Sequence, residues 1–452
     1  MAKDLDMTSG SVFKLLMKLS IPAICAQIIN LLYNIVDRMY IGHIALIGKD
    51  ALTGVGVCMP IILAISAFAA LVSMGGAPRS SIFMGKKDMD SANKVLGNCA
   101  VALVIISISL TVAVLFFKED LLYLLGASVN TFKYANDYIS IYALGTLFVQ
   151  LTLGLNAFIT SQGFTNVSMK ATVIGAICNI ILDPIFIFVL GLNVKGAALA
   201  TIISQFISMI FVIRFLVSDK TILRLDVKYL KLEKDVIVPC ITLGLAPFIM
   251  QFSESFVMLS FNTSLAKYGG DIAVGAMTIL NSVNQFSMLP IVGLTQGAQP
   301  IISYNYGANN LKRVKSCFMV LLVCCVLFTS LIWSVCMFAP NLFVSLFTSD
   351  VELRVFTINA LRVFAFVLWI FGAQMACQQT FIAVNKAAQA IFLALLRKVV
   401  LLIPLIYILP NFFSDKVFAV YLAEPVADGI AVTVTVILFV ITFKKLLRNS
   451  LD

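Results

Sequence analysis

Twelve long apolar segments constrain the fold of this chain more than any other feature of its sequence. Each approaches the ~20 residues that an α-helix needs to cross a bilayer. Hydrophobic residues make up 61% of the 452 residues and charged residues only 12%, which excludes a water-soluble fold. The sequence therefore predicts an all-α integral membrane protein in a lipid bilayer, with twelve transmembrane helices near residues 14–42, 51–78, 93–117, 133–160, 165–190, 196–217, 236–264, 272–302, 315–339, 353–380, 385–411 and 416–443.

The basic residues predict how these helices are oriented. If both termini are cytoplasmic, the inner segments hold 21 of the 32 Lys and Arg residues and the outer loops hold seven. This is the positive-inside pattern for an even number of spans. The net charge of +10 is then explained by topology, so we expect no nucleic-acid partner. We expect a monomeric, multi-pass protein of the cell (plasma) membrane with both termini in the cytoplasm.

The chain also carries an internal repeat. The sequences GGAPRSSIFMG at 75–85 and GAQPIISYNYG at 297–307 share Gly, then Pro, then Gly at a constant offset of 222 residues. Since Pro fixes φ and Gly admits positive φ, we expect equivalent turns at the inner ends of the two halves. Six spans in each half give both the same orientation, as two pseudo-symmetric lobes around a central cavity. The expected division is an amino-terminal six-helix lobe, a cytoplasmic linker and a carboxy-terminal six-helix lobe, at 1–218, 219–235 and 236–452.

Two acidic residues stand inside apolar segments of the first half. An ionisable group in the hydrocarbon costs about 2.5–3.5 kcal/mol, so each needs a partner, water or a function. Asp183 follows Asn179 by four residues on one helix face, and Pro184 frees a carbonyl near that turn. Asp37 ends a polar stripe on the first segment that includes Asn34. Their oxygens suit Na⁺ or a proton. The alternative is that each acid lies at a helix end among the lipid headgroups.

The second half carries further charged residues in its apolar segments. Glu254 is followed by a long apolar run, and a lone carboxylate there holds a proton or faces a hydrated cavity. Arg397 and Lys398 interrupt the eleventh segment, and Glu424 and Asp428 lie four residues apart on the twelfth. These last four residues form an interhelical ion pair, or they take part in substrate or proton binding.

Neutral polar residues predict a cavity wall between the two halves. Each of them can line a substrate cavity beside Glu254, or can simply hydrogen-bond to a neighbouring helix. The candidates are Asn34, Gln251, Asn281, Gln285 and Gln378.

The sequence lacks the motifs of common enzymes. The single His allows neither an H-E-x-x-H zinc motif nor a His-based triad, and no G-x-x-x-x-G-K-[ST] phosphate loop occurs. None of the ten Cys residues forms a C-x-x-C pair. We expect no enzymatic activity, no cofactor, and no metal beyond Na⁺ at Asp37, Asn179 and Asp183.

Five stretches of sequence together resemble the multidrug and toxic compound extrusion (MATE) family. They match the patterns of that family in place and order over nearly the whole chain: YNIVDRMYIG (33–42), MGGAPRSSIFMGKKD (74–88), NIILDPIFI (179–187), GAQPIISYNYGANNLKRVK (297–315) and LAEPVADGIA (422–431). The resemblance implies a secondary antiporter that exports amphipathic, often cationic, small molecules in exchange for H⁺ or Na⁺. It also implies that two lobes rock about the central cavity.

The resemblance further implies where the coupling ion binds. One branch of the family uses an Asp on the first span, an Asn and an Asp on the fifth, and a Thr on the sixth. Those positions match Asp37, Asn179, Asp183 and Thr201. Another branch uses a carboxylate on the seventh span, which Glu254 matches after a one-residue gap. The choice between H⁺ and Na⁺ therefore stays open, and so does the lobe that binds the ion.

Two other functions remain as alternatives. A lipid-linked precursor flippase of the same superfamily would usually have a more cationic cavity than this sequence predicts. A membrane-embedded transferase would need a catalytic base and a metal or phosphate site, which the sequence does not provide.

Overall fold

The computed structural model describes residues 7–348 and 350–448. Residues 1–6 and 449–452 lie outside the described residues. The prediction that both termini are cytoplasmic concerns these residues in part. The described chain is helical, with no residue in a β-strand. Its helices are α1 (Val12–Gly42), α2 (Gly48–Gly85), α3 (Met89–Leu124), α4 (Val129–Leu144), α5 (Thr146–Ser161), α6 (Thr165–Pro184), η1 (Ile185–Val189), α7 (Val194–Val217), η2 (Val227–Tyr229), α8 (Lys234–Gly307), α9 (Leu311–Phe338), α10 (Asn341–Val344), α11 (Val351–Phe364), α12 (Leu368–Ala383), α13 (Ala387–Leu395), η3 (Leu396–Leu402), α14 (Ile403–Ile408), η4 (Leu409–Asn411) and α15 (Lys416–Arg448).

These helices account for the predicted membrane spans. Nine helices of the described chain are long and apolar enough to cross a membrane, and the bent pairs α4–α5 and α11–α12 add two more. Helix α8 has 74 residues, or about 110 Å of length, which far exceeds the thickness of one bilayer. Its backbone breaks at Gly270, where φ is 64° and ψ is −159°. Counting α8 as two spans brings the total to twelve, consistent with the predicted number.

The repeat is visible in the helix boundaries. Helices α3, α4, α5, α6 and α7 begin 222 residues before α9, α11, α12, α13 and α15, respectively. The fourth span of each half is bent at the corresponding place, by 56° between α4 and α5 and by 49° between α11 and α12. The two halves are therefore built on one pattern, including a bend that the sequence analysis did not predict.

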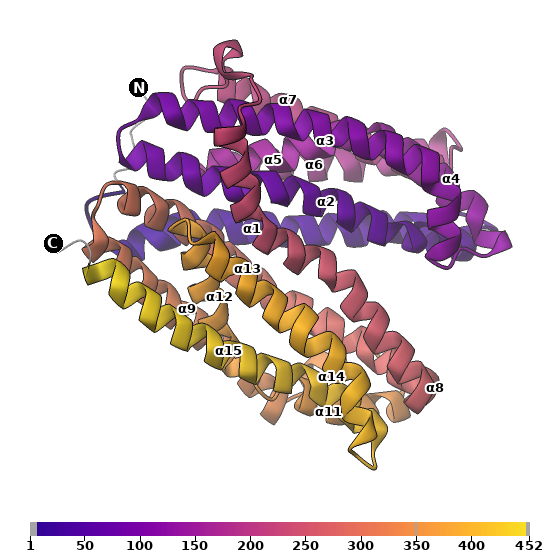
Figure 1. The fold of residues 1–452 in the computed structure, drawn as a ribbon. Coiled ribbons are helices and arrows are strands. Elements are labelled where there is room, and N and C mark those ends of the chain that lie inside the picture. Colours follow the sequence, from indigo (N-terminus) through magenta and orange to yellow (C-terminus); the bar gives the residue numbers. More distant parts are fainter. Residues whose placement is uncertain (1–6, 349, 449–452) are drawn as a thin grey trace.

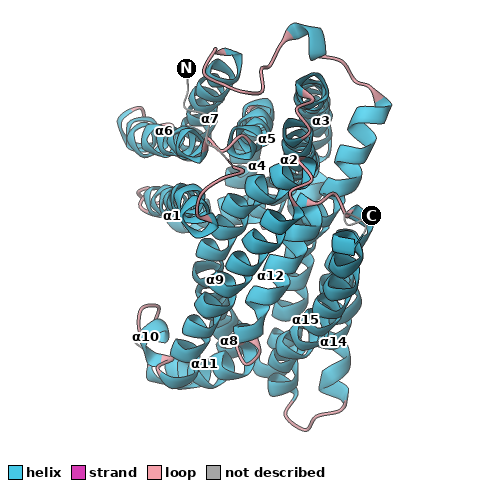
Figure 2. Cartoon of the chain, turned by 90° about the vertical axis from the view of Figure 1, so that its left-hand side faces the viewer, coloured by secondary structure: helices cyan, strands magenta, loops and turns pink. Residues whose placement is uncertain are grey.

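The helices form two bundles, α1–α7 and α8–α15. Figure 1 shows that the bundles lie close together at the end of the molecule near the two termini and diverge toward the other end. Figure 2 views the molecule from the side near the termini, where helices of the first bundle are seen almost end-on. Large apolar side chains such as Phe116 (79% exposed) and Leu124 (82% exposed) face outward, as expected for a lipid-covered surface. The predicted all-α membrane fold with two lobes is confirmed.

Glycines allow the two bundles to touch closely. A Cβ atom added to Gly75 of α2 would overlap the carbonyl oxygen of Cys240 on α8, and one added to Gly297 of α8 would lie 2.7 Å from the main-chain nitrogen of Ser20 on α1. The turns predicted at 75–85 and 297–307 are wrong, because both stretches lie inside helices. The repeated glycines act through their lack of a side chain, which lets two helix backbones approach each other.

The linker between the bundles packs against the first bundle. The side-chain oxygen of Gln162 accepts hydrogen bonds from the main-chain N–H groups of Ile222 and Leu223, at 2.8 Å each. The side-chain oxygen of Asn98 accepts another from the main-chain N–H of Glu233. Side chains of α3 and the end of α5 therefore satisfy main-chain donors of the linker that have no helical partner.

Candidate functional site

Two buried carboxyl groups meet between α1 and α6. Asp37, in the last two turns of α1, is 9% exposed, and Asp183, near the end of α6, is fully buried. The two carboxyl groups interact directly. Both acids therefore lie inside the first bundle, rather than at an exposed helix end.

The local backbone of α6 explains how Asp183 is presented. Pro184 lacks a main-chain N–H, so the regular helical ladder cannot continue through it. The chain goes on as the π-helix η1, a wider turn that is frequent at functional sites. One turn before Asp183, the amide of Asn179 donates a hydrogen bond to Asp183 Oδ1 at 3.1 Å. Asn179 and Asp183 thus share the face of α6 that meets Asp37.

Three oxygen atoms of this site are buried and lack a hydrogen-bond donor among the described residues: Asp37 Oδ1, Asn179 Oδ1 and Asp183 Oδ2. Within the described chain, neither Asp forms an ion pair with a Lys or Arg. Two carboxylates this close cannot both stay charged without compensation, so the site must hold a cation or retain a proton. Carboxylate and amide oxygens are ligands that a hard cation such as Na⁺ accepts. The donor set therefore fits either ion.

Three hydroxyl groups complete the surroundings of the carboxyl pair. Thr201 on α7 donates to the main-chain oxygen of Ala197 at 3.0 Å and also contacts the Tyr138 hydroxyl. Tyr33 on α1 and Tyr138 on α4 both interact electrostatically with Asp37. The sequence analysis missed both tyrosines. Tyr33 precedes Asp37 by four residues on the same helix face, which was a usable signal, whereas nothing in the local sequence marks Tyr138.

A second charged cluster lies in the other bundle. Arg397, in the π-helix η3, donates to Asp428 Oδ1 at 2.6 Å and to Glu424 Oε1 at 3.0 Å, both on α15. Its guanidinium also stacks on the ring of Phe371, 4.4 Å from the ring centre. All three charged side chains are at least nine-tenths buried. The structure thus holds Arg397 in an ion pair with both acids of the twelfth span.

Lys398 turns to a different partner. Its ammonium lies 2.8 Å from Glu254 Oε2 on α8. The Lys398 side chain is 7% exposed and that of Glu254 is 55% exposed, so the carboxylate is the solvent-accessible member of the pair. Glu254 is therefore not a lone carboxylate, because Lys398 balances its charge.

The neutral polar residues predicted to line a cavity lie at different depths. Gln251 and Gln285 are exposed, whereas Asn34 and Asn281 are half-buried. Gln378 is buried, and its amide donates to a methionine sulfur of α8 at 2.9 Å. This set stays a prediction.

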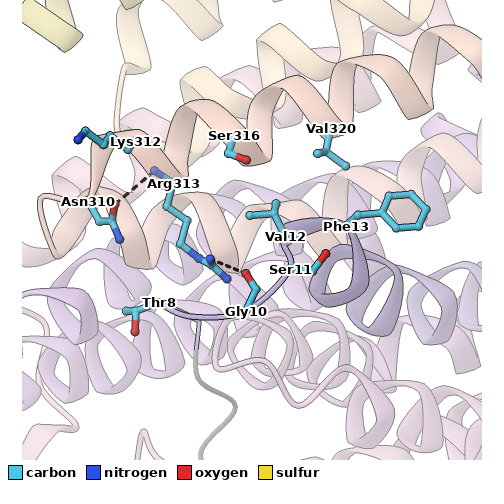
Figure 3. A pocket seen from close by; sticks show the side chains of 10 residues that line it. All are labelled: Thr8, Gly10, Ser11, Val12, Phe13, Asn310, Lys312, Arg313, Ser316 and Val320. Carbon is cyan, nitrogen blue, oxygen red and sulfur yellow. Dashed lines mark hydrogen bonds between the residues drawn. The ribbon is translucent and has the colours of Figure 1, made fainter.

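A cleft of about 570 Å³ lies elsewhere, between the segment before α1 and the start of α9 (Figure 3). Arg313 of α9 donates hydrogen bonds there to the main-chain oxygens of Met7, Ser9 and Gly10. None of the predicted site residues lines this cleft. Its side chains tie the beginning of the first bundle to the second bundle.

The family model MatE matches residues 22–185 and 247–408, one stretch in each bundle and more than half of the chain in total. The chain belongs to the MatE family. The resemblance seen in the sequence motifs is confirmed, and the two matched stretches fall in the two halves of the repeat.

Curated relatives align with this MatE protein along nearly its whole length. The Multidrug export protein MepA of Staphylococcus haemolyticus is 28% identical over 424 residues, which cover 93% of each chain. The protein of the same name from Staphylococcus saprophyticus is 26% identical over 431 residues, covering 95% of this chain and 94% of that one.

Solved structures of MATE proteins share the fold. A structure described as MATE in the bent conformation has a TM-score of 0.93 at 22% identity and covers 100% of this chain and 99% of its own. The outward-facing conformation of a multidrug resistance MATE family transporter has a TM-score of 0.89 at 22% identity, with 99% of each chain covered. At this identity the likeness shows the fold, a multi-pass membrane protein of two helical lobes.

Proposed function

We propose that this MatE protein is a secondary active multidrug efflux transporter. It exports amphipathic, often cationic, small molecules in exchange for H⁺ or Na⁺, by alternating access of its two lobes. Family membership and the export function named for the MepA relatives support this proposal. Its substrates are small molecules, and it works as a monomer without a cofactor or enzymatic step.

The observation that carries the proposal is the buried carboxyl pair of the first bundle. Asp37 and Asp183 lie together. Their buried oxygens that lack a hydrogen-bond donor can together bind one monovalent cation or one proton. Asn179 supplies a neutral oxygen, and Thr201 lies on the neighbouring helix. An ion bound here can drive transport only if its affinity differs between the two states of the carrier.

The arrangement of the bundles supports alternating access. They touch through the glycine contacts of α1, α2 and α8 and diverge away from the termini (Figure 1). We propose that the touching end faces the cytoplasm of a cell whose plasma membrane holds the protein, with both termini on that side. The proposed lobes are 1–218 and 236–452, joined by the linker 219–235.

Transport in liposomes tests the proposal. An H⁺ gradient and a Na⁺ gradient are imposed in separate experiments. Purified protein should export a lipophilic cationic dye in at least one of them. Asp37→Asn and Asp183→Asn keep the shape of the side chains but remove a charge, so each should reduce ion-driven export to background. Asp120→Asn, at an exposed position of α3, is the matched control and should transport normally.

The double variant distinguishes one site from two. If Asp37 and Asp183 bind one ion together, the double variant should transport no worse than either single variant. Additive partial losses would mean two independent sites. Export by both single variants at the wild-type rate would contradict the assignment. Movement of a lipid-linked precursor without dye export would favour the flippase alternative, and chemical conversion of a lipid substrate would favour the transferase.

A further inference from the structure

In the charged cluster of the second bundle, the acidic groups outnumber the basic groups. Three carboxyl groups, those of Glu254, Glu424 and Asp428, face two cations, Arg397 and Lys398. Within the described chain, the charges that act on Glu254 and Glu424 all belong to this cluster. With every group ionised, the cluster would carry one uncompensated negative charge. Because the Glu424 and Asp428 side chains are at least nine-tenths buried, one further positive charge is needed beside them.

The two cations are held very differently. Arg397 is fixed by two charged hydrogen bonds and by the ring beneath its guanidinium. Lys398 makes one ion pair, with Glu254, although its ammonium has three N–H donors. Lys398 also interacts electrostatically with Glu424 of α15. Glu424 is therefore a second carboxyl group that feels the charge of Lys398, whereas Arg397 is already paired with both Asp428 and Glu424.

The two ends of the Lys398–Glu254 pair differ in exposure. The Lys398 side chain is 7% exposed and reaches the pair from inside the bundle, whereas the Glu254 side chain is 55% exposed. A cation that approaches from the open side meets the Glu254 carboxylate first. It can replace the ammonium without moving any other charged group of the cluster.

We propose that Lys398 is a tethered competitor that a cationic substrate displaces from Glu254, and that its ammonium then pairs with Glu424. Before binding, Glu254 pairs with Lys398, Asp428 with Arg397, and Glu424 carries a proton. After binding, Glu254 pairs with the substrate cation and Lys398 with Glu424, whose proton has left for water. One positive charge enters and one leaves, so the net charge of the cluster stays at zero.

This inference rests on the proposed function, because it takes the exported compound to be a cation. It adds that the second bundle itself exchanges a monovalent cation for a proton. Lys398 sets the specificity of the exchange, since a neutral compound offers no charge to replace the ammonium.

Calorimetry of the purified protein tests the inference without any transport. The probe is tetraphenylphosphonium, a monocation with no proton to lose, titrated at pH 7 in phosphate and in Tris. The different ionisation enthalpies of the two buffers report the number of protons released. Wild-type protein should release about one proton per bound tetraphenylphosphonium, as the charge count requires.

Variants separate the roles of the two residues. Lys398→Met removes the competitor, so tetraphenylphosphonium should bind roughly fivefold more tightly or better. Glu424→Gln removes the titrating group, so binding should release no proton. Triphenylphosphine oxide, a neutral compound of similar shape, should bind both variants as it binds the wild type. Lys444→Met, at an exposed position of α15, is the control and should behave as the wild type.

These experiments distinguish failure of the inference about Lys398 from failure of the proposed export function. Binding by the wild type without proton release, or binding by Lys398→Met that is no tighter, would overturn the inference alone, because cation export could still occur. A wild-type protein that neither binds tetraphenylphosphonium nor exports cationic dye would overturn both. The proton count is measured on the wild type, so it decides the question even if a variant does not fold.

Discussion

The contact between α2 and α8 leads to a quantitative prediction for Gly75→Ala. The added Cβ atom would overlap the carbonyl oxygen of Cys240 and would lie 2.8 Å from the main-chain nitrogen of Gly244. Both are backbone atoms of α8, so no side chain can rotate away. Since real Cβ atoms essentially never come closer than about 3.0 Å to another atom, the two helices must part by more than about 1 Å to relieve the overlap with the Cys240 oxygen.

The energetic consequence follows from measured effects of overpacking. Forcing an extra methyl group into a close-packed contact costs about 1–3 kcal/mol, which corresponds to a factor of about 5 to 150 in an equilibrium constant. The cost falls on the state in which the bundles touch, because the contact is absent once they separate. Gly75→Ala should therefore raise the population of the open state by that factor.

Native cysteines report this opening directly. Cys240 is fully buried beside Gly75, and Cys58, also fully buried, lies 17 residues earlier than Gly75 on α2, or about 25 Å along the helix. Peptide mass spectrometry after treatment with N-ethylmaleimide should show faster alkylation of Cys240 in Gly75→Ala, by roughly 5- to 150-fold. Cys58 should react at its wild-type rate.

Gly56→Ala on the same helix is the matched control, because a Cβ atom at Gly56 would meet nothing within 4 Å. It should leave both thiols unchanged. If Gly75→Ala leaves the alkylation of Cys240 unchanged, the contact does not hold the bundles together. If Cys58 and Cys240 accelerate equally, the substitution destabilises the whole fold, and the reasoning about the contact is refuted.

Two further predictions concern the second bundle and its link to the first. Arg313→Gln removes the charged donors to the main chain of residues 7–10, so hydrogen exchange in that segment should accelerate roughly tenfold; an unchanged rate, as expected for Lys312→Gln, would contradict this role. Arg397→Leu leaves the buried Asp428 carboxylate without its cation and Glu424 without its donor, so thermal unfolding in detergent should show a loss of about 3–5 kcal/mol. Adding Asp428→Asn should recover part of that loss, and no recovery would argue against the ion pair as the cause.

The spans were predictable from the sequence because hydropathy over about 20 residues is a local property. The segment predicted at 133–160 became α4 and α5, whose outer limits, 129 and 161, differ from it by only a few residues. The bend of 56° between α4 and α5 was not predictable in the same way. It depends on how the two parts pack against neighbouring helices, which hydropathy does not record.

The same distinction between local properties and packing applies to the candidate site. Asn179 and Asp183 could be placed together from their spacing, because both lie on one helix face. The ion pair between Lys398 and Glu254 joins residues 144 apart in the chain, and only the packing of α8 against the eleventh span brings them together. Each of these charged residues is recognisable in the sequence because it interrupts an apolar segment, but its ion-pair partner is not.

The glycine motif shows a different kind of error. The φ preferences of Gly and Pro predict turns at 75–85 and 297–307. In the structure both stretches are helical, and the role of Gly75 and Gly297 is close approach between backbones. Small residues at helix contacts are common in membrane proteins, where packing rather than burial from water drives association. The apolar surroundings therefore favoured a contact over a turn.

The fifth spans of the two halves show how one scaffold has acquired two chemistries. Each contains a proline, Pro184 or Pro404, beside a π-helical stretch, η1 or η3. At the repeat offset of 222, however, Lys398 corresponds to Ala176, and Asn179 to an apolar residue, Leu401. Among the described residues, the carboxyl pair of the first bundle thus has no Lys or Arg partner, whereas the acids of the second bundle are paired with Arg397 and Lys398. If both bundles bind a cation, as proposed above, their different ligand sets give them different affinities, so the two ions need not bind and leave at the same stage of the cycle.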